Sequence, residues 1–188
     1  MEEELKRFLA QRTKQYITDK QRVPSAVLIP LFQEEGEYSI VFIKRTMKVK
    51  THKGQISFPG GMRDKGDKTL LDTALRESEE EIGLNRKDVN ILGELDDEIT
   101  TTSNFTVTPF VAKIPWPYQF TLNKEEVEKV ISVPVKALLD KECLKPVTEI
   151  LDGKNVASFA YHYRGTVIWG ATARILNKLL KTITMITR

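Results

Sequence analysis

The sequence has a single cysteine, Cys143, among its 188 residues. One cysteine excludes an internal disulfide framework and is typical of proteins in a reducing compartment. No stretch approaches the roughly 20 consecutive apolar residues that a membrane-spanning helix requires. Three glutamates follow Met1 directly, without an apolar run, so we expect no secretory signal. These absences predict a cytoplasmic protein with no membrane partner.

An excess of charge of one sign is also missing. The chain has 29 Lys and Arg against 26 Asp and Glu, a formal net charge of +3, which is too balanced to predict a nucleic-acid or anionic-membrane partner. The charges are unevenly distributed, because six basic and no acidic residues lie in 38–63, whereas seven acidic and three basic residues lie in 64–81. The length and the 40% hydrophobic content predict one globular domain over 1–188.

Hydrophobic periodicity predicts a mixture of helices and strands. We expect an N-terminal amphipathic helix within 1–23 and a β-hairpin formed by 26–32 and 38–43 around a polar turn. A helix is predicted over 67–83, with Asp67 as its N-cap and Gly83 as its C-terminal stop. The remaining elements are strands at 88–95, 104–114 and 156–169, a short helix at 133–139 and a helix at 171–182. Together they predict an α/β fold with a sheet covered on both faces.

The predicted central helix carries a crowded group of carboxylates. At about 100° per residue, Glu77, Glu80 and Glu81 share one face of this helix. Like charges at this spacing destabilise a helix unless a cation intervenes, and Mg²⁺ prefers carboxylate oxygens and substrate phosphates. A solvated acidic face is the alternative interpretation. The helix stop at Gly83 and the preceding tight turn 58–61 favour a metal site.

The segment 61–84 resembles the Nudix box of the Nudix hydrolases. Gly61 is followed by Arg76-Glu77-Ser78-Glu79-Glu80-Glu81-Ile82-Gly83-Leu84, with Ser78 at an apolar position of the family pattern. Asp67 stands where the family has a glutamate, but with one extra residue before Arg76, and it is left out of the predicted metal site. The resemblance implies an α/β/α sandwich around a mixed β-sheet. It also implies a hydrolase of diphosphate bonds that uses Mg²⁺ or Mn²⁺ held by Glu77, Glu80 and Glu81.

The resemblance extends to the coenzyme A pyrophosphatase branch of that superfamily. The motif positions are Arg45, Lys50 and Phe58-Pro59-Gly60-Gly61, with Lys50 replacing the second arginine of the branch. These residues are therefore predicted to bind substrate. Further catalytic candidates are Arg76, which is expected to orient the glutamates, and Glu80 as the base. Glu126 and Glu125 are the other candidate bases.

The leading interpretation is cleavage of coenzyme A or acyl-CoA to 3′,5′-ADP and 4′-phosphopantetheine or its acyl form. The alternatives are a Nudix hydrolase for ADP-ribose, another nucleotide sugar or a nucleoside triphosphate, and an inactive binding module of the same fold. RNA binding through the basic stretch 44–53 is disfavoured, because few aromatic residues interleave with it. A monomer and a homodimer both remain open. Trp169 and Phe110 are expected in the core, and Cys143 is expected to be unreactive.

Overall fold

The computed structural model describes residues 1–49, 52–100, 103–151 and 154–187. Its centre is a mixed β-sheet, in which β1 and β7 run parallel and the other neighbouring strands are antiparallel. The path through the sheet is β3 (Ile56–Ser57), β2 (Glu37–Arg45), β1 (Val23–Glu34), β7 (Phe105–Lys113) and β5 (Asn90–Glu94). Beside this path, β4 (Gly60–Met62) pairs with β1, β6 (Glu98–Ile99) with β7, and β8 (Val127–Pro134) with β2.

The predicted hairpin is confirmed as β1 and β2. Leu31 pairs with Ile40, and Glu34 pairs with Glu37 across a two-residue turn. Both turn residues, Glu35 and Gly36, have positive φ angles, the geometry that matches the twist of two antiparallel strands. Along β1 successive side chains alternate between two hydrophobic clusters, one on each face of the sheet. This double burial explains why the strand is apolar at nearly every position.

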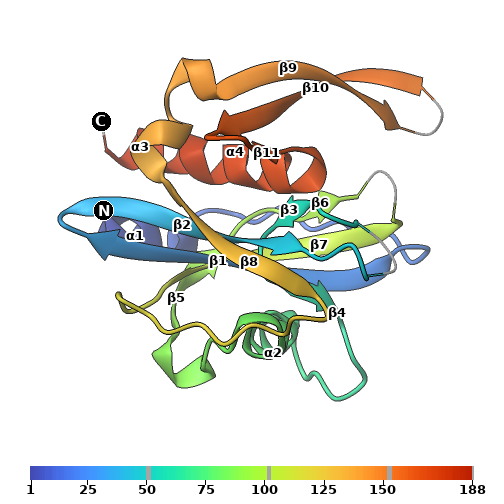
Figure 1. Ribbon diagram of the computed structural model, residues 1–188, viewed down its shortest axis with the longest axis horizontal. Helices are drawn as coiled ribbons and strands as arrows, with labels where there is room; N and C mark the ends of the chain where they lie inside the picture. Colours follow the sequence, from blue (N-terminus) through green and yellow to red (C-terminus); the bar gives the residue numbers. More distant parts are fainter. Residues whose placement is uncertain (50–51, 101–102, 152–153, 188) are drawn as a thin grey trace.

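Helices cover both faces of the central sheet, as Figure 1 shows. Helix α2 (Leu70–Ile82) packs on one face, and α1 (Glu2–Gln11) and α4 (Gly170–Ile186) pack on the other. The predicted α/β/α sandwich is therefore confirmed. A second sheet of β11 (Thr166–Ile168), β10 (Lys154–Tyr163) and β9 (Leu144–Leu151) lies beyond α4. The sequence analysis did not predict this second sheet.

The N-terminal helix is shorter than predicted, because it ends at Gln11. Leu5 and Leu9 are buried as its periodicity implies, but Tyr16 is 68% exposed. After the helix, the backbone N–H of Gln15 donates to the carboxylate of Asp96 at 2.8 Å. The N–H of Ile17 donates to Asp97 at 3.0 Å. The backbone N–H groups of Gln15 and Ile17 thus bond to Asp96 and Asp97, which follow β5, instead of to carbonyl groups of a longer helix.

The start of α2 also differs from the prediction. The N-cap is Thr69, whose side chain accepts from the Asp72 N–H in a reciprocal capping box, so the prediction of Asp67 as the cap is wrong. Gly83 at the other end has φ 67° and ψ 22°, which confirms the predicted left-handed stop. Asp67 lies one turn before the helix and points towards Arg76.

Five strands were not predicted from the periodicity, namely the short β3, β4 and β6 and the longer β8 and β9. Strand β8 has charged, exposed residues at Glu128 and Lys129, which hide its pairing with β2. Strand β9 contains Pro146 and pairs only with β10, a position at the sheet edge where proline is tolerated. The predicted short helix at 133–139 is present as α3 and is shorter than predicted (Val135–Leu138). None of the helices in the described residues is long and apolar enough to cross a membrane.

Candidate active site

A cavity of about 450 Å³ lies between α2, the turn that joins β3 to β4, and the first turn of α4. Its charged lining consists of four carboxylates and one guanidinium: Glu77, Glu80, Glu81, Glu126 and Arg45. Its apolar lining includes Val27, Ile56, Phe58, Phe105, Trp169 and Ile175. The cavity is therefore acidic at one part of its wall and apolar at another.

Two glycines let the backbone approach the acidic wall. Gly60 pairs with Val27 of β1 at φ 149°, and a Cβ atom there would lie 2.3 Å from the carbonyl oxygen of Ala26. At Gly61 a Cβ atom would lie 2.4–2.7 Å from the carboxylate atoms of Glu77. The Gly-Gly pair thus brings β4 against β1 and leaves room for the Glu77 carboxylate.

The three clustered glutamates of α2 differ strongly in exposure. The side chain of Glu81 is 2% exposed, that of Glu77 is 17% exposed and that of Glu80 is 57% exposed. Glu79 is exposed and does not line the cavity, in agreement with the predicted helix faces. Ser78 takes an apolar position of the helix, where its hydroxyl donates to the Ala74 carbonyl at 2.7 Å. The helix therefore presents carboxylates at three different depths.

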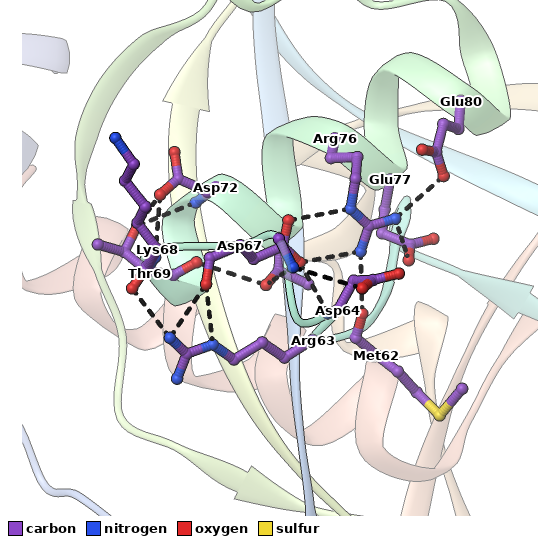
Figure 2. A network of polar contacts seen from close by, with 12 residues as sticks. Met62, Arg63, Asp64, Asp67, Lys68, Thr69, Asp72, Arg76, Glu77 and Glu80 are labelled. Carbon is purple, nitrogen blue, oxygen red and sulfur yellow. Dashed lines mark hydrogen bonds and ion pairs between the residues drawn. The ribbon is translucent and has the colours of Figure 1, made fainter.

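Arg76 organises the outer two of these carboxylates. Its Nη1 donates to Glu77 Oε1 at 2.8 Å and to Glu80 Oε2 at 3.0 Å. Its other nitrogens donate to Asp67, which lies on the opposite side of the guanidinium, as Figure 2 shows. The hydrogen bond from Arg76 is the main reason why the pKa of Asp67 lies well below its usual range. Arg76 therefore positions other residues.

Glu81 is the buried acid of the site. Its Oε2 accepts from the Gly60 N–H at 2.9 Å, and its Oε1 accepts from Arg45 Nη1 at 3.0 Å. Burial raises the pKa of Glu81 to about 8, although the Gly60 N–H and Arg45 act in the opposite direction. Burial also raises the pKa of Glu77, and the charge of Glu126 adds to both increases. Desolvation therefore disfavours the ionised form of both carboxylates, in spite of their arginine partners.

Glu126 reaches the site from the loop before β8. Its carbonyl accepts from the Thr46 N–H at 2.8 Å, which holds the loop beside the end of β2. Its side chain accepts from Asn123 Nδ2 at 3.3 Å and lines the cavity. The neighbouring Glu125 is 75% exposed and pairs with Lys48 instead. Of the two loop glutamates, only Glu126 therefore lies at the site.

Comparison of the sequence with known proteins shows the family of this chain. The family model of the NUDIX domain matches residues 22–151, which is more than half of the chain. The chain belongs to the Nudix family. It is 31% identical over 159 residues to the uncharacterized Nudix hydrolase NudL of Photorhabdus laumondii, covering 85% of this chain and 84% of that protein. The corresponding protein of Yersinia pestis is 32% identical over 161 residues, covering 86% and 80%.

Solved structures show the same fold at low identity. A MutT/nudix family protein from Enterococcus faecalis superposes with a TM-score of 0.60 at 13% identity, covering 96% of this chain and 68% of that chain. The Nudix hydrolase RenU of M. smegmatis superposes with a TM-score of 0.56 at 17% identity, covering 88% of both chains. The protein is thus an enzyme of the Nudix class, whose members hydrolyse diphosphate bonds.

Nudix hydrolases generally use divalent metals, and the donor set here fits such an ion. Four carboxylates and one guanidinium line the cavity, and the most buried of these carboxylates, Glu81, has a raised pKa. Oxygen donors with excess negative charge are the ligands that Mg²⁺ and Mn²⁺ prefer. Within the described parts of the chain, no three acidic, His or Cys side chains form a preformed metal cage. One oxygen each of Glu77 and Glu80 accepts a hydrogen bond from Arg76, and one oxygen of Glu81 accepts from Arg45.

The residues predicted to bind substrate lie at different positions relative to the cavity. Gly60, Gly61 and Arg45 line the cavity. Phe58 also lines it, but it is 2% exposed and stacks on Phe42 with ring centroids 4.8 Å apart, so it supports the wall. Pro59 is buried, and its carbonyl accepts from the Leu28 N–H at 2.9 Å. Lys50 lies outside the described residues.

One part of the cavity wall, at the start of α4, was not predicted from the sequence. Trp169 is 39% exposed and lines the cavity, so the expectation that it lies in the core is wrong. Phe110, by contrast, is buried as expected. Trp169 lies between β11 and α4, about 90 residues after the Nudix box in the sequence. No spacing rule within the motif points to it.

Proposed function

We propose that this Nudix enzyme hydrolyses the diphosphate bond of coenzyme A or an acyl-CoA, giving 3′,5′-ADP and 4′-phosphopantetheine or its acyl form. One observation carries the proposal: the carboxylates of α2 and the apolar residues Phe105 and Trp169 line the same cavity. A diphosphate with small substituents does not need an apolar wall. A substrate with large organic groups on both phosphates does.

The motif positions support this substrate class. Arg45, Gly60 and Gly61, which match the coenzyme A pyrophosphatase motif, line the cavity together. The Arg45 Nε atom is buried and has no hydrogen-bond partner in the described structure, so this guanidinium retains donor capacity. A phosphate oxygen near Arg45 would satisfy that donor.

Hydrolysis requires a water oxygen to bond to one phosphorus while the bond from that phosphorus to the bridging oxygen breaks. Each product then leaves with its own phosphate group, and the water proton passes to a base. Glu126 and Glu80 are the carboxylates proposed for this proton, because both line the cavity. Glu77, Glu80 and Glu81 would hold Mg²⁺ or Mn²⁺, which supplies positive charge at the phosphate oxygens and acidifies a bound water. Arg76 keeps Glu77 and Glu80 in place.

A substrate panel tests the proposal. The protein is assayed with Mg²⁺ and with Mn²⁺ on coenzyme A, acetyl-CoA, ADP-ribose, a nucleotide sugar and a nucleoside triphosphate, and products are identified by mass spectrometry. We expect the highest kcat/KM with coenzyme A or acetyl-CoA, and 3′,5′-ADP as a product of both. A higher kcat/KM on ADP-ribose or a triphosphate would overturn the substrate assignment. No turnover of any compound, with metal binding absent in calorimetry, would support a binding module instead.

A further inference from the structure

Trp169 has a position that packing alone does not explain. It follows the fully buried Ile168, yet its own side chain is 39% exposed and lines the cavity. The other tryptophan, Trp116, stacks on Phe32 with ring centroids 3.7 Å apart and an interplanar angle of 14°. Within the described residues, no ring pair or cation–π pair involves Trp169. A large aromatic face is thus left for a ligand.

Local structure rules do not favour tryptophan at this position either. Trp169 is the N-cap of α4 and makes no side-chain capping hydrogen bond. Serine, threonine, aspartate and asparagine are preferred there, because their side chains accept from the free N–H groups of the first turn. A helix of 17 residues that begins without this stabilisation, at a cavity wall, departs from its local preference where function is expected.

Polar groups without partners lie in the same lining. The hydroxyl oxygens of Ser57 and Ser103 are shielded from water and have no hydrogen-bond partner among the described residues. Both residues line the cavity, together with Gly170 and Thr172 of the uncapped first turn of α4. An aromatic face accompanied by unsatisfied hydroxyl groups suits a flat ligand with donors and acceptors along its edge.

We infer that Trp169 is the stacking surface for the nucleobase of the substrate, so that this side of the diphosphate favours a group with a base over a group without one. This inference rests on the proposed function, and it specifies which half of the substrate lies at α4. A nucleobase combines a π-face with polar edge atoms, and stacking on an aromatic side chain accepts any base. A pantetheine or acyl chain has no aromatic face to stack on Trp169, although the amide groups of pantetheine can bond to hydroxyls such as those of Ser57 and Ser103.

Tryptophan fluorescence tests the inference without turnover. Trp169 is the sole tryptophan in the Trp116→Phe variant, in which phenylalanine retains an aromatic ring against Phe32. The ligands are 3′,5′-ADP, AMP, ribose 5-phosphate and 4′-phosphopantetheine. We expect the two adenine nucleotides to quench the Trp169 emission and the two ligands without a base to leave it unchanged. Absence of quenching by both nucleotides, or quenching by 4′-phosphopantetheine alone, would overturn the inference.

Affinity measurements on Trp169 variants supply the second test. Trp169→Leu removes the ring but keeps an apolar side chain, and Trp169→Phe keeps a smaller ring. Calorimetry should show 3′,5′-ADP binding weakened on the order of tenfold in Trp169→Leu and within about threefold of normal in Trp169→Phe. Ribose 5-phosphate binding should change in neither. Equal losses for both ligands, with an unchanged melting temperature, would contradict stacking.

The two proposals can fail separately. If coenzyme A is not hydrolysed but AMP quenches the Trp169 emission, the substrate assignment is wrong and the stacking role is retained. If coenzyme A is hydrolysed and Trp169→Leu binds 3′,5′-ADP with normal affinity, the stacking role is wrong and the substrate assignment is retained.

Discussion

Asp67 and Arg76 face each other through two hydrogen bonds, Nε to Oδ1 and Nη2 to Oδ2, both 3.0 Å long (Figure 2). The Asp67 side chain is 6% exposed, and its partner continues to Glu77 and Glu80 through Nη1. The pair thus links the loop before α2 to two carboxylates of the site. Asp67 does not contact the proposed metal ligands itself. It holds Arg76, and Arg76 orients Glu77 and Glu80.

Replacement of Asp67 by asparagine should weaken both the fold and catalysis. The loss of the paired charge next to Arg76 should cost on the order of 2 kcal/mol in the free energy of unfolding, because Asp67 is buried and Arg76 is partly solvated. We expect kcat to fall about tenfold with little change in KM, since Arg76 no longer holds Glu77 and Glu80 in one orientation. Urea unfolding and steady-state kinetics measure the two effects.

Asp64→Asn is the control for Asp67, because Asp64 is an exposed residue of the same loop. It should change neither quantity appreciably. The pKa of Asp67 is lowered in the folded protein, so its contribution is present at neutral pH and is lost as the pH falls through that lowered pKa. Asp67→Asn should therefore lose less stability than the native protein on acidification. Identical acid-unfolding curves would contradict this role.

The metal-ligand proposal predicts that Glu77→Gln loses most of the activity. Glutamine keeps the shape but removes the negative charge, so kcat should fall about 100-fold or more while the fold persists. Calorimetry with Mn²⁺ should show weaker binding. Glu79→Gln on the same helix is the matched control, because Glu79 is exposed and away from the cavity. Equal kcat values for the two variants would exclude Glu77 from the metal site.

The two glycines of the turn should fail in different ways. Gly61→Ala places a Cβ atom against the end of the Glu77 side chain, which can move, so we expect kcat to fall by tenfold or more with little loss of stability. In Gly60→Ala the added Cβ atom would collide with the Ala26 carbonyl oxygen, at a positive φ angle that alanine rarely adopts. The free energy of unfolding should therefore fall by about 2–3 kcal/mol. Gly66→Ala, where a Cβ atom meets open space, is the control. Thermal unfolding and kcat separate these outcomes, and a stable Gly60→Ala protein would refute the packing argument.

Glu126 and Glu125 form a natural pair of test positions. Glu126→Gln should lower kcat about 100-fold if this carboxylate takes the water proton. Glu125→Gln should leave kcat unchanged, because that side chain is exposed and pairs with Lys48. A normal kcat in Glu126→Gln would move the base assignment to Glu80.

The buried acid Glu81 predicts a pH dependence of stability in the metal-free protein. Its pKa is about 8 when folded against an ordinary value of 4.5, so the folded state keeps a proton that the unfolded state releases between these values. The free energy of unfolding should therefore fall as the pH rises through this window, by on the order of a few kcal/mol. Urea unfolding in EDTA at pH 5.5 and pH 8 measures this difference.

Two further measurements test the Glu81 assignment. Glu81→Gln should show a smaller difference between the two pH values, because glutamine has no proton to lose. Added Mn²⁺ should restore the stability of the native protein at pH 8, since the ion binds the ionised carboxylates of the folded state. An equal pH dependence in Glu81→Gln would show that other groups cause it.

The acidic face of α2 was predictable because it depends only on helical periodicity. Residues three and four positions apart share a face whatever surrounds the helix, which put Glu77, Glu80 and Glu81 together. The length of the N-terminal helix was not predictable. Its end depends on hydrogen bonds from Asp96 and Asp97, some 80 residues away, to backbone groups of Gln15 and Ile17.

The sequence by itself determined the Nudix family, the α/β class, the Gly-Gly turn and the carboxylate face, because these depend on local spacing and on residues that few others can replace. Only the tertiary structure decided that Asp67 supports Arg76, that Glu126 rather than Glu125 lines the cavity, and that Trp169 faces it. Those positions are set by strand pairing and packing between distant segments, and such contacts leave no periodic signal in the chain.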